Sequence, residues 1–112
     1  MVEHVDRLRT VAVCGAKDCR GRAGHADLLA QLTSGDVPCR VVETRCLDVC
    51  SGPVVVVGVG ERKPRVFRKL RGRKQRRDLT AVVAGASMTD RLRAIRVTGA
   101  SARRAVSRIR PR

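Results

Sequence analysis

The sequence has almost no aromatic residues. Phe67 is its single phenylalanine, and it has no tryptophan or tyrosine. A chain of 112 residues is expected to form one domain with a modest core. Aliphatic side chains must fill that core, and a bound cofactor that ties loops together would offset the shortage. The lack of aromatics also disfavours sequence-specific recognition of single-stranded nucleic acid by base stacking.

Long apolar runs are missing as well. No run approaches the ~20 residues that a membrane-spanning helix needs, and the N-terminal residues lack the apolar segment of a signal peptide. We therefore expect a cytoplasmic protein, in a compartment where thiols stay reduced. The sequence has no Gly-rich phosphate loop, no Ser/His/Asp set and no carboxylate pair suited to acid–base catalysis, so we expect no independent enzyme activity.

Acidic residues are scarce in the second half of the chain. Residues 1–60 hold seven Lys or Arg and seven Asp or Glu, whereas residues 61–112 hold eighteen basic residues and three acidic ones. The formal net charge of +15 therefore belongs to the second half. Such asymmetry indicates a basic tail or an acidic partner rather than a generally basic fold.

The hydrophobic pattern predicts the element order β-α-β-β-β-α. Strands are expected at residues 8–13, 37–43, 53–57 and 65–70. A helix is expected at residues 25–33, and a second helix from residue 74 carries Leu79, Val82, Val83 and Ala86 at helical spacing. Because a helix joins the first two strands, these should be parallel. The fold class predicted is α/β, a thioredoxin-like mixed sheet flanked by helices, with a basic C-terminal extension.

The predicted domain covers residues 1–86, and residues 87–112 form an arginine-rich tail that is partly helical or disordered. The tail has two short apolar faces, which are too short to be stable helices without packing against the domain or a partner. They consist of Met88, Leu92 and Ile95, and of Ala102, Val106 and Ile109. A solvated surface, an acidic partner and nucleic acid remain alternative explanations of the arginines.

Four of the five cysteines form two pairs, Cys14/Cys19 and Cys46/Cys50. Each pair follows a predicted strand, and parallel strands release their loops at the same edge of a sheet. Spaced pairs in a cytoplasmic chain are typical of metal or redox ligands, and four thiolates suit a 2Fe–2S cluster. A structural zinc site and ordinary buried or redox thiols are the alternatives. The absence of Cys-x-x-Cys weakens a thioredoxin-type dithiol enzyme.

Five other residues have expected roles near these cysteines. Cys39 should be part of the core, and His25 should be a packed histidine on the apolar face of its helix rather than a ligand. Asp48 is expected to cap its loop, and tuning of a cluster is the alternative role. Gly15 and Gly52 can let backbone amides approach the sulfur atoms of a cluster.

The segment from residue 11 to 57 resembles the thioredoxin-like 2Fe–2S ferredoxins, to which the small ferredoxin-like subunit of NADH dehydrogenase also belongs. The resemblance extends over roughly residues 8–86 and consists of a strand, Cys14-x4-Cys19, a helix, a strand, Cys46-Leu47-x-Val49-Cys50, Gly52-Pro53 and a valine run. It implies that Cys14, Cys19, Cys46 and Cys50 are the cluster ligands.

The expected function is that of a small one-electron carrier with one 2Fe–2S cluster. Its basic second half would steer it to an acidic redox partner, and Lys17, Arg20 and Arg45 would favour reduction of the cluster. The alternative is a zinc-stabilised nucleic-acid-binding module that uses the basic tail. We expect no membrane contact. We also expect that the chain can form a homodimer.

Overall fold

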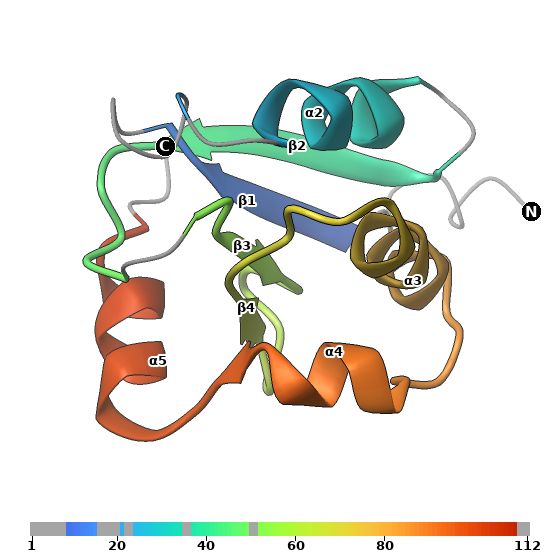
Figure 1. The fold of residues 1–112 in the computed structure, drawn as a ribbon. Helices are drawn as coiled ribbons and strands as arrows, with labels where there is room; N and C mark the ends of the chain where they lie inside the picture. The colour runs from blue at the N-terminus through green and yellow to red at the C-terminus, as the bar shows by residue number, and fades with distance from the viewer. Residues whose placement is uncertain (1–8, 16–20, 22–23, 35–36, 50–51, 110–112) are drawn as a thin grey trace, which may run out of the picture.

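The computed structural model describes residues 9–15, 21, 24–34, 37–49 and 52–109. Its core is a five-stranded mixed sheet with the order β2-β1-β3-β4-β5 (Figure 1). β1 and β2 are parallel, and each remaining neighbouring pair is antiparallel. The strands are β1 (Arg9–Cys14), β2 (Cys39–Thr44), β3 (Val55–Val57), β4 (Arg65–Phe67) and β5 (Arg96–Val97). The predicted α/β class with a mixed sheet is confirmed.

Within the described residues, four helices accompany the sheet: α2 (His25–Thr33), α3 (Arg73–Val83), α4 (Asp90–Ala94) and α5 (Gly99–Ser107). The elements from β1 to α3 lie where the sequence predicts them, and the parallel pairing of β1 with β2 is also confirmed. Among the described residues, no helix combines the length and the apolar character that crossing a membrane requires.

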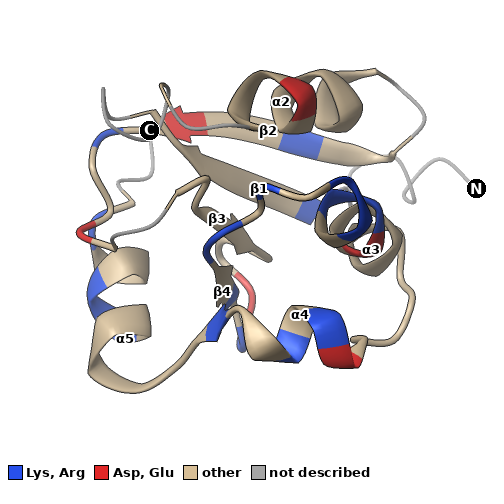
Figure 2. Ribbon diagram, in the orientation of Figure 1, with Lys and Arg blue, Asp and Glu red and all other residues tan. Residues whose placement is uncertain are grey.

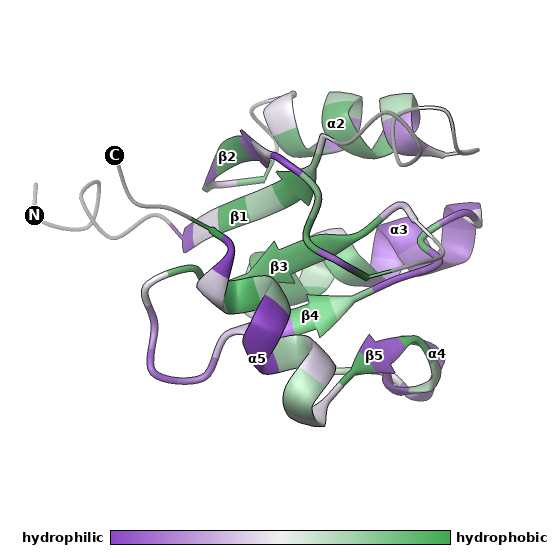
Figure 3. Ribbon diagram, turned by 90° about the vertical axis from the view of Figure 1, so that its left-hand side faces the viewer, coloured by the Kyte–Doolittle hydropathy of each residue, from purple (hydrophilic) through white to green (hydrophobic). Residues whose placement is uncertain are grey.

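The sheet separates two apolar layers. Along β1, Val11 and Val13 face the layer that contains buried residues of α2, α3 and α4, whereas Ala12 and Cys14 face the layer beneath α5. This alternation follows from the two-residue period of a strand. Figure 3 shows mostly hydrophobic residues in β1, β3 and β4, and residues of mixed hydropathy in the helices around them. Cys14 therefore lies on the α5 side of the sheet.

The described part of the predicted tail belongs to this fold, which corrects the expectation of an appendage. β5 pairs with β4, and Ile95 O accepts a hydrogen bond from Arg68 N at 3.0 Å. Leu92 and Ala105 are both fully buried, one on each face of the sheet. Residues 87–109 therefore supply an edge strand and a second helical layer, because their small apolar faces find partners on the sheet. Residues 110–112 lie outside the described residues.

The basic first turn of α3 has a partial structural explanation in Arg76. Positive charge at a helix N-terminus is unfavourable, but Arg76 turns inward and is 8% exposed. Its Nη1 donates to the carbonyl oxygens of Leu70 and Arg71, and its Nη2 lies 3.6 Å from Asp27 Oδ2. Gly24 allows this approach, since a Cβ there would lie 2.5 Å from Nη1. Arg76 thus joins α3, the preceding loop and α2.

Candidate metal centre

The loops that carry the cysteine pairs begin next to each other. Cys14 is the last residue of β1 and pairs with Thr44, the last residue of β2. The N–H of Gly15 donates to Thr44 O at 2.7 Å, which extends the pairing by one residue. Cys46 follows two positions after Thr44. Both loops therefore leave the carboxyl-terminal edge of the same parallel strand pair (Figure 1).

Cys14 is fixed at this edge by its backbone and its side chain. Its N–H donates to Val54 O at 2.9 Å, which links the end of β1 to the segment before β3. Its side chain is fully buried in the apolar layer that also contains Leu47 and Val54. Its Sγ lies 3.8 Å from the carbonyl oxygen of Arg45, the residue that precedes Cys46. Sulfur from the first loop thus contacts the backbone of the second.

Cys46 is exposed and its sulfur accepts a backbone hydrogen bond. The N–H of Asp48 donates to Cys46 Sγ at 3.3 Å, with Asp48 in the left-handed region at φ 59°. Leu47, between them, is 1% exposed and anchors the loop in the apolar layer. Amide donors of this kind orient a thiolate ligand and adjust the electron density on its sulfur. The loop therefore presents one sulfur outward in a defined geometry.

Helix α5 holds this second loop from outside. Arg108 Nε donates to Cys46 O at 2.9 Å, and Arg104 Nη1 lies 3.3 Å from Asp48 Oδ2. The Asp48 carboxylate therefore pairs with α5. Its predicted role as a cap of the loop stays a prediction, because residues 50–51 lie outside the described residues. The sequence analysis missed both arginines because their contacts join residues 56 and 62 positions apart, and no local pattern signals them.

The N–H of Gly15 is itself bonded to Thr44 O and is not free to approach a cluster sulfur. That Gly15 lets another backbone amide approach a cluster stays a prediction, since residues 16–20 lie outside the described residues. Glycine is required here for another reason, since a Cβ would lie 2.8 Å from Thr44 O. Gly52 is buried and its carbonyl accepts from Arg71 Nε at 3.1 Å. An amide contact from Gly52 to a cluster stays a prediction.

His25 and Cys39 are packed as predicted. His25 is 4% exposed, and its Nε2 lies 3.2 Å from Cys14 O, so the ring supports the end of β1. Cys39 packs against the layer of α2, and its Sγ lies 3.6 Å from Leu32 O. Burial raises the pKa of the Cys39 thiol, which keeps it protonated and weakens it as a ligand.

The structure places two of the four candidate ligands, one from each loop. Cys14 and Cys46 both lie at this edge as free thiols. Cys19 and Cys50, together with Lys17 and Arg20, lie outside the described residues. Within the described residues, no group of three or more His, Cys, Asp or Glu side chains is arranged to hold a metal ion. A complete site would therefore need Cys19 and Cys50.

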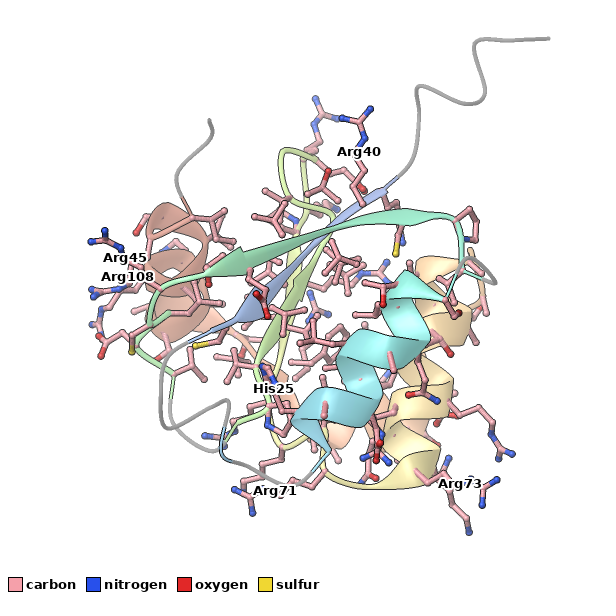
Figure 4. The ribbon with its side chains drawn as sticks, turned by 90° about the horizontal axis from the view of Figure 1, so that it is seen from above. His25, Arg40, Arg45, Arg71, Arg73 and Arg108 are labelled. Carbon is pink, nitrogen blue, oxygen red and sulfur yellow. The ribbon has the colours of Figure 1, made fainter. Side chains whose placement is uncertain are left out.

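Positive charge surrounds the exposed cysteine. In Figure 4, Arg45 and Arg108 extend to the same side of the molecule, whereas Arg40 lies toward the opposite end of β2. Arg104 also lies at this edge, where the carboxylate of Asp48 offsets its charge. Figure 2 shows Lys and Arg distributed over α3, α4 and α5, with few acidic residues between them. The field at this edge therefore favours negative charge.

Comparisons with protein-family models, with curated proteins and with solved structures found no match for this chain. The resemblance to thioredoxin-like ferredoxins therefore depends on the cysteine spacing and its strand context.

Proposed function

We propose that this protein is a small cytoplasmic one-electron carrier, which binds one 2Fe–2S cluster through Cys14, Cys19, Cys46 and Cys50. The observation that carries the proposal is the parallel pairing of β1 with β2, which starts both cysteine loops at one edge. A cluster needs thiolates from both pairs in one place. Two features support the thioredoxin-like arrangement in this proposal. The strand order is β2-β1-β3-β4 with β3 antiparallel to its neighbours, and helices cover both faces of the sheet.

The described donors fit such a group in their chemistry. Thiolates are the natural ligands of iron–sulfur iron, and Cys14 and Cys46 supply them from two loops. The Asp48 N–H already donates to Cys46 Sγ, and Leu47 and Val54 form an apolar wall beside Cys14. When bound, the cluster would supply the one-electron redox step. The chain's own residues would hold it, limit water on the α5 side and set the local charge.

The arginines at the same edge support the assignment of redox chemistry. An oxidised 2Fe–2S cluster with four thiolates has a formal charge of −2, and reduction adds one more negative charge. The guanidinium groups of Arg45 and Arg108 favour that added charge, although solvent screens them. We propose an acidic protein as the redox partner, because this edge would attract an acidic surface.

The test of the cluster uses two matched cysteine variants purified without oxygen. Cys46→Ser removes a proposed ligand, and Cys39→Ser removes a partly buried cysteine packed against the other layer. We expect visible cluster absorption in the wild type and in Cys39→Ser, and its loss in Cys46→Ser. A colourless wild type that contains zinc would instead support the zinc-stabilised nucleic-acid-binding module.

The test of the partner's charge uses small oxidants of opposite sign. Oxidation of the reduced protein by the anion ferricyanide should slow as salt is raised from ~10 to ~150 mM, and oxidation by the cation hexaamminecobalt(III) should quicken. Arg45→Gln should weaken the ferricyanide salt dependence, while the control Arg40→Gln at the other end of β2 should leave it unchanged. Equal effects of the two variants would reject steering through this edge.

A further inference from the structure

A second cationic site lies away from the cysteine loops. A hollow of about 470 Å³ is lined by Arg65, Gly85, Ala86, Ser87, Met88, Arg93 and Arg96. Arg65 is the first residue of β4 and pairs with Val57, at the end of the sheet where β1 begins. Cys14 lies at the other end of β1. The lining of the hollow includes Arg93 of α4 and Met88, which packs against the apolar layer on the side of the sheet opposite α5. It is therefore separate from the proposed cluster site.

The strand register brings two of these arginines to the same face. Arg96 lies opposite Phe67, and Arg65 lies two residues before Phe67 on β4, so both alternate to the side that Phe67 occupies. Their positions are diagonal neighbours, which are ~7–8 Å apart and within reach of long side chains. Two positive charges at these positions repel each other. Packing of the sheet therefore does not explain why both positions are arginine.

The arginines of the hollow have little internal compensation. Arg93 Nη1 lies 2.8 Å from Asp90 Oδ1, but the carboxylate of Asp90 is 99% exposed. The side chains of Arg65 and Arg96 form no ion pair or hydrogen bond with any residue in the described part of the chain. The hollow thus has two uncompensated guanidinium groups and a third whose partner is open to solvent.

We propose that this hollow binds an oligophosphate group. The guanidinium fork matches phosphate oxygens bidentately, and three such groups line this open, polar hollow. No tryptophan or tyrosine exists in the chain, and Phe67 is buried, so base stacking is not provided. The ligand is recognised by its phosphates, whether these belong to a free nucleoside polyphosphate or to a nucleic-acid backbone.

The experiment compares two double variants with the same change in charge. Arg65→Gln/Arg96→Gln alters the hollow, and the control Arg40→Gln/Arg103→Gln alters exposed positions on β2 and α5. Inorganic triphosphate is titrated by calorimetry at low salt, and a labelled oligothymidylate by fluorescence anisotropy. We expect at least ~tenfold weaker binding in the hollow variant and near-wild-type binding in the control.

The two probes distinguish the sources of phosphate. Binding of triphosphate by the hollow indicates a free polyphosphate ligand. If only the oligonucleotide binds, with a salt slope that falls by ~2 in the hollow variant, the ligand is a nucleic-acid backbone. Equal loss in hollow and control variants, or no binding of either probe, would overturn the proposal.

Two further variants separate phosphate binding from effects on folding and on the proposed cluster. Arg65→Lys/Arg96→Lys keeps the charge but removes the fork, so we expect binding weaker than wild type. Undiminished binding would contradict recognition by guanidinium geometry. The Cys46→Ser protein should bind triphosphate like the wild type, because the hollow and the cysteine edge are separate. Loss of binding there would overturn that separation.

Discussion

Arg108 Nε donates a hydrogen bond to the carbonyl oxygen of Cys46 at 2.9 Å, across 62 residues of chain. Through this contact the last helix holds the loop that carries an exposed cysteine. The neighbouring ion pair between Arg104 and Asp48 holds the same loop, but both of its side chains are about half exposed, so it contributes less. Part of the C-terminal basic segment thus has a structural role at the candidate metal centre.

Replacing Arg108 should loosen that loop. Arg108→Gln removes a hydrogen bond from a charged donor at a partly solvated site, and we expect a loss of ~1 kcal/mol in the free energy of unfolding by urea. Amide hydrogen exchange at Leu47 and Asp48 should also become faster. The matched control is Arg103→Gln on the same helix, which should change neither quantity. Identical behaviour of the two variants would show that the Cys46 contact does not hold the loop.

The packing of α5 can be tested at Ala105, which is fully buried. Ala105→Leu inserts a larger side chain between helix and sheet, and we expect destabilisation of ~1–3 kcal/mol. Ala100→Leu, at an exposed position of the same helix, should change stability by less than ~0.5 kcal/mol. The measurement is the midpoint of thermal or urea unfolding. If neither substitution changes stability, α5 does not pack against the sheet as described.

The first four strands and the first two helices could be predicted because large aliphatic residues mark them. Val54–Val57 forms a buried run, and Leu79, Val82 and Val83 repeat at helical spacing. β5 has only two residues, and α5 buries a single alanine and contains two arginines. Neither gives a strong hydrophobic pattern, so both were assigned to a tail. Their placement depends on long-range contacts that a local pattern does not contain.

The candidate site was predictable to a similar extent. Strand ends and cysteine spacing indicated that Cys14 and Cys46 would lie at one edge, where the structure places them. The close approach of Gly15 to Thr44 O could not be predicted, because a sequence does not show which atom lies next to a glycine. The contacts of Arg104 and Arg108 required the fold of the C-terminal segment.

The buried guanidinium of Arg76 should be important for stability. Arg76→Met leaves the carbonyl oxygens of Leu70 and Arg71 without their side-chain donor, and we expect a loss of ~2–3 kcal/mol in unfolding free energy. The ion pair with Asp27 adds little, because that carboxylate is 74% exposed. Lys74→Met, exposed on the same helix, is the control and should be near neutral. Similar losses in both would indicate a general effect of charge removal.

Stability should depend on pH through Asp78. A hydrogen bond from Thr89 Oγ1 at 2.8 Å, and then one from Arg91, hold the pKa of Asp78 below its usual value. Its contribution is therefore fully present above the unfolded pKa of ~3.9 and is lost as pH falls through the folded pKa. The carboxylate joins α3 to α4, so its protonation should loosen that junction.

The measurement compares unfolding free energies of the wild type and Asp78→Asn between pH 6 and pH 3. The difference should be largest at pH 6 and should shrink below about pH 4, near the unfolded pKa. Glu43→Gln, at an exposed position of β2, is the control and should track the wild type at every pH. A difference between wild type and Asp78→Asn that does not vary with pH would contradict the account of Asp78.

Metal and sulfide analysis of the anaerobically reconstituted wild-type chain tests the central claim most directly, together with paramagnetic resonance after reduction by dithionite. We predict two iron ions and two acid-labile sulfides per chain, with a one-electron signal that appears on reduction. Stoichiometric zinc without sulfide, or a chain that binds neither metal nor sulfide, would contradict the proposal that the two cysteine loops hold a 2Fe–2S cluster.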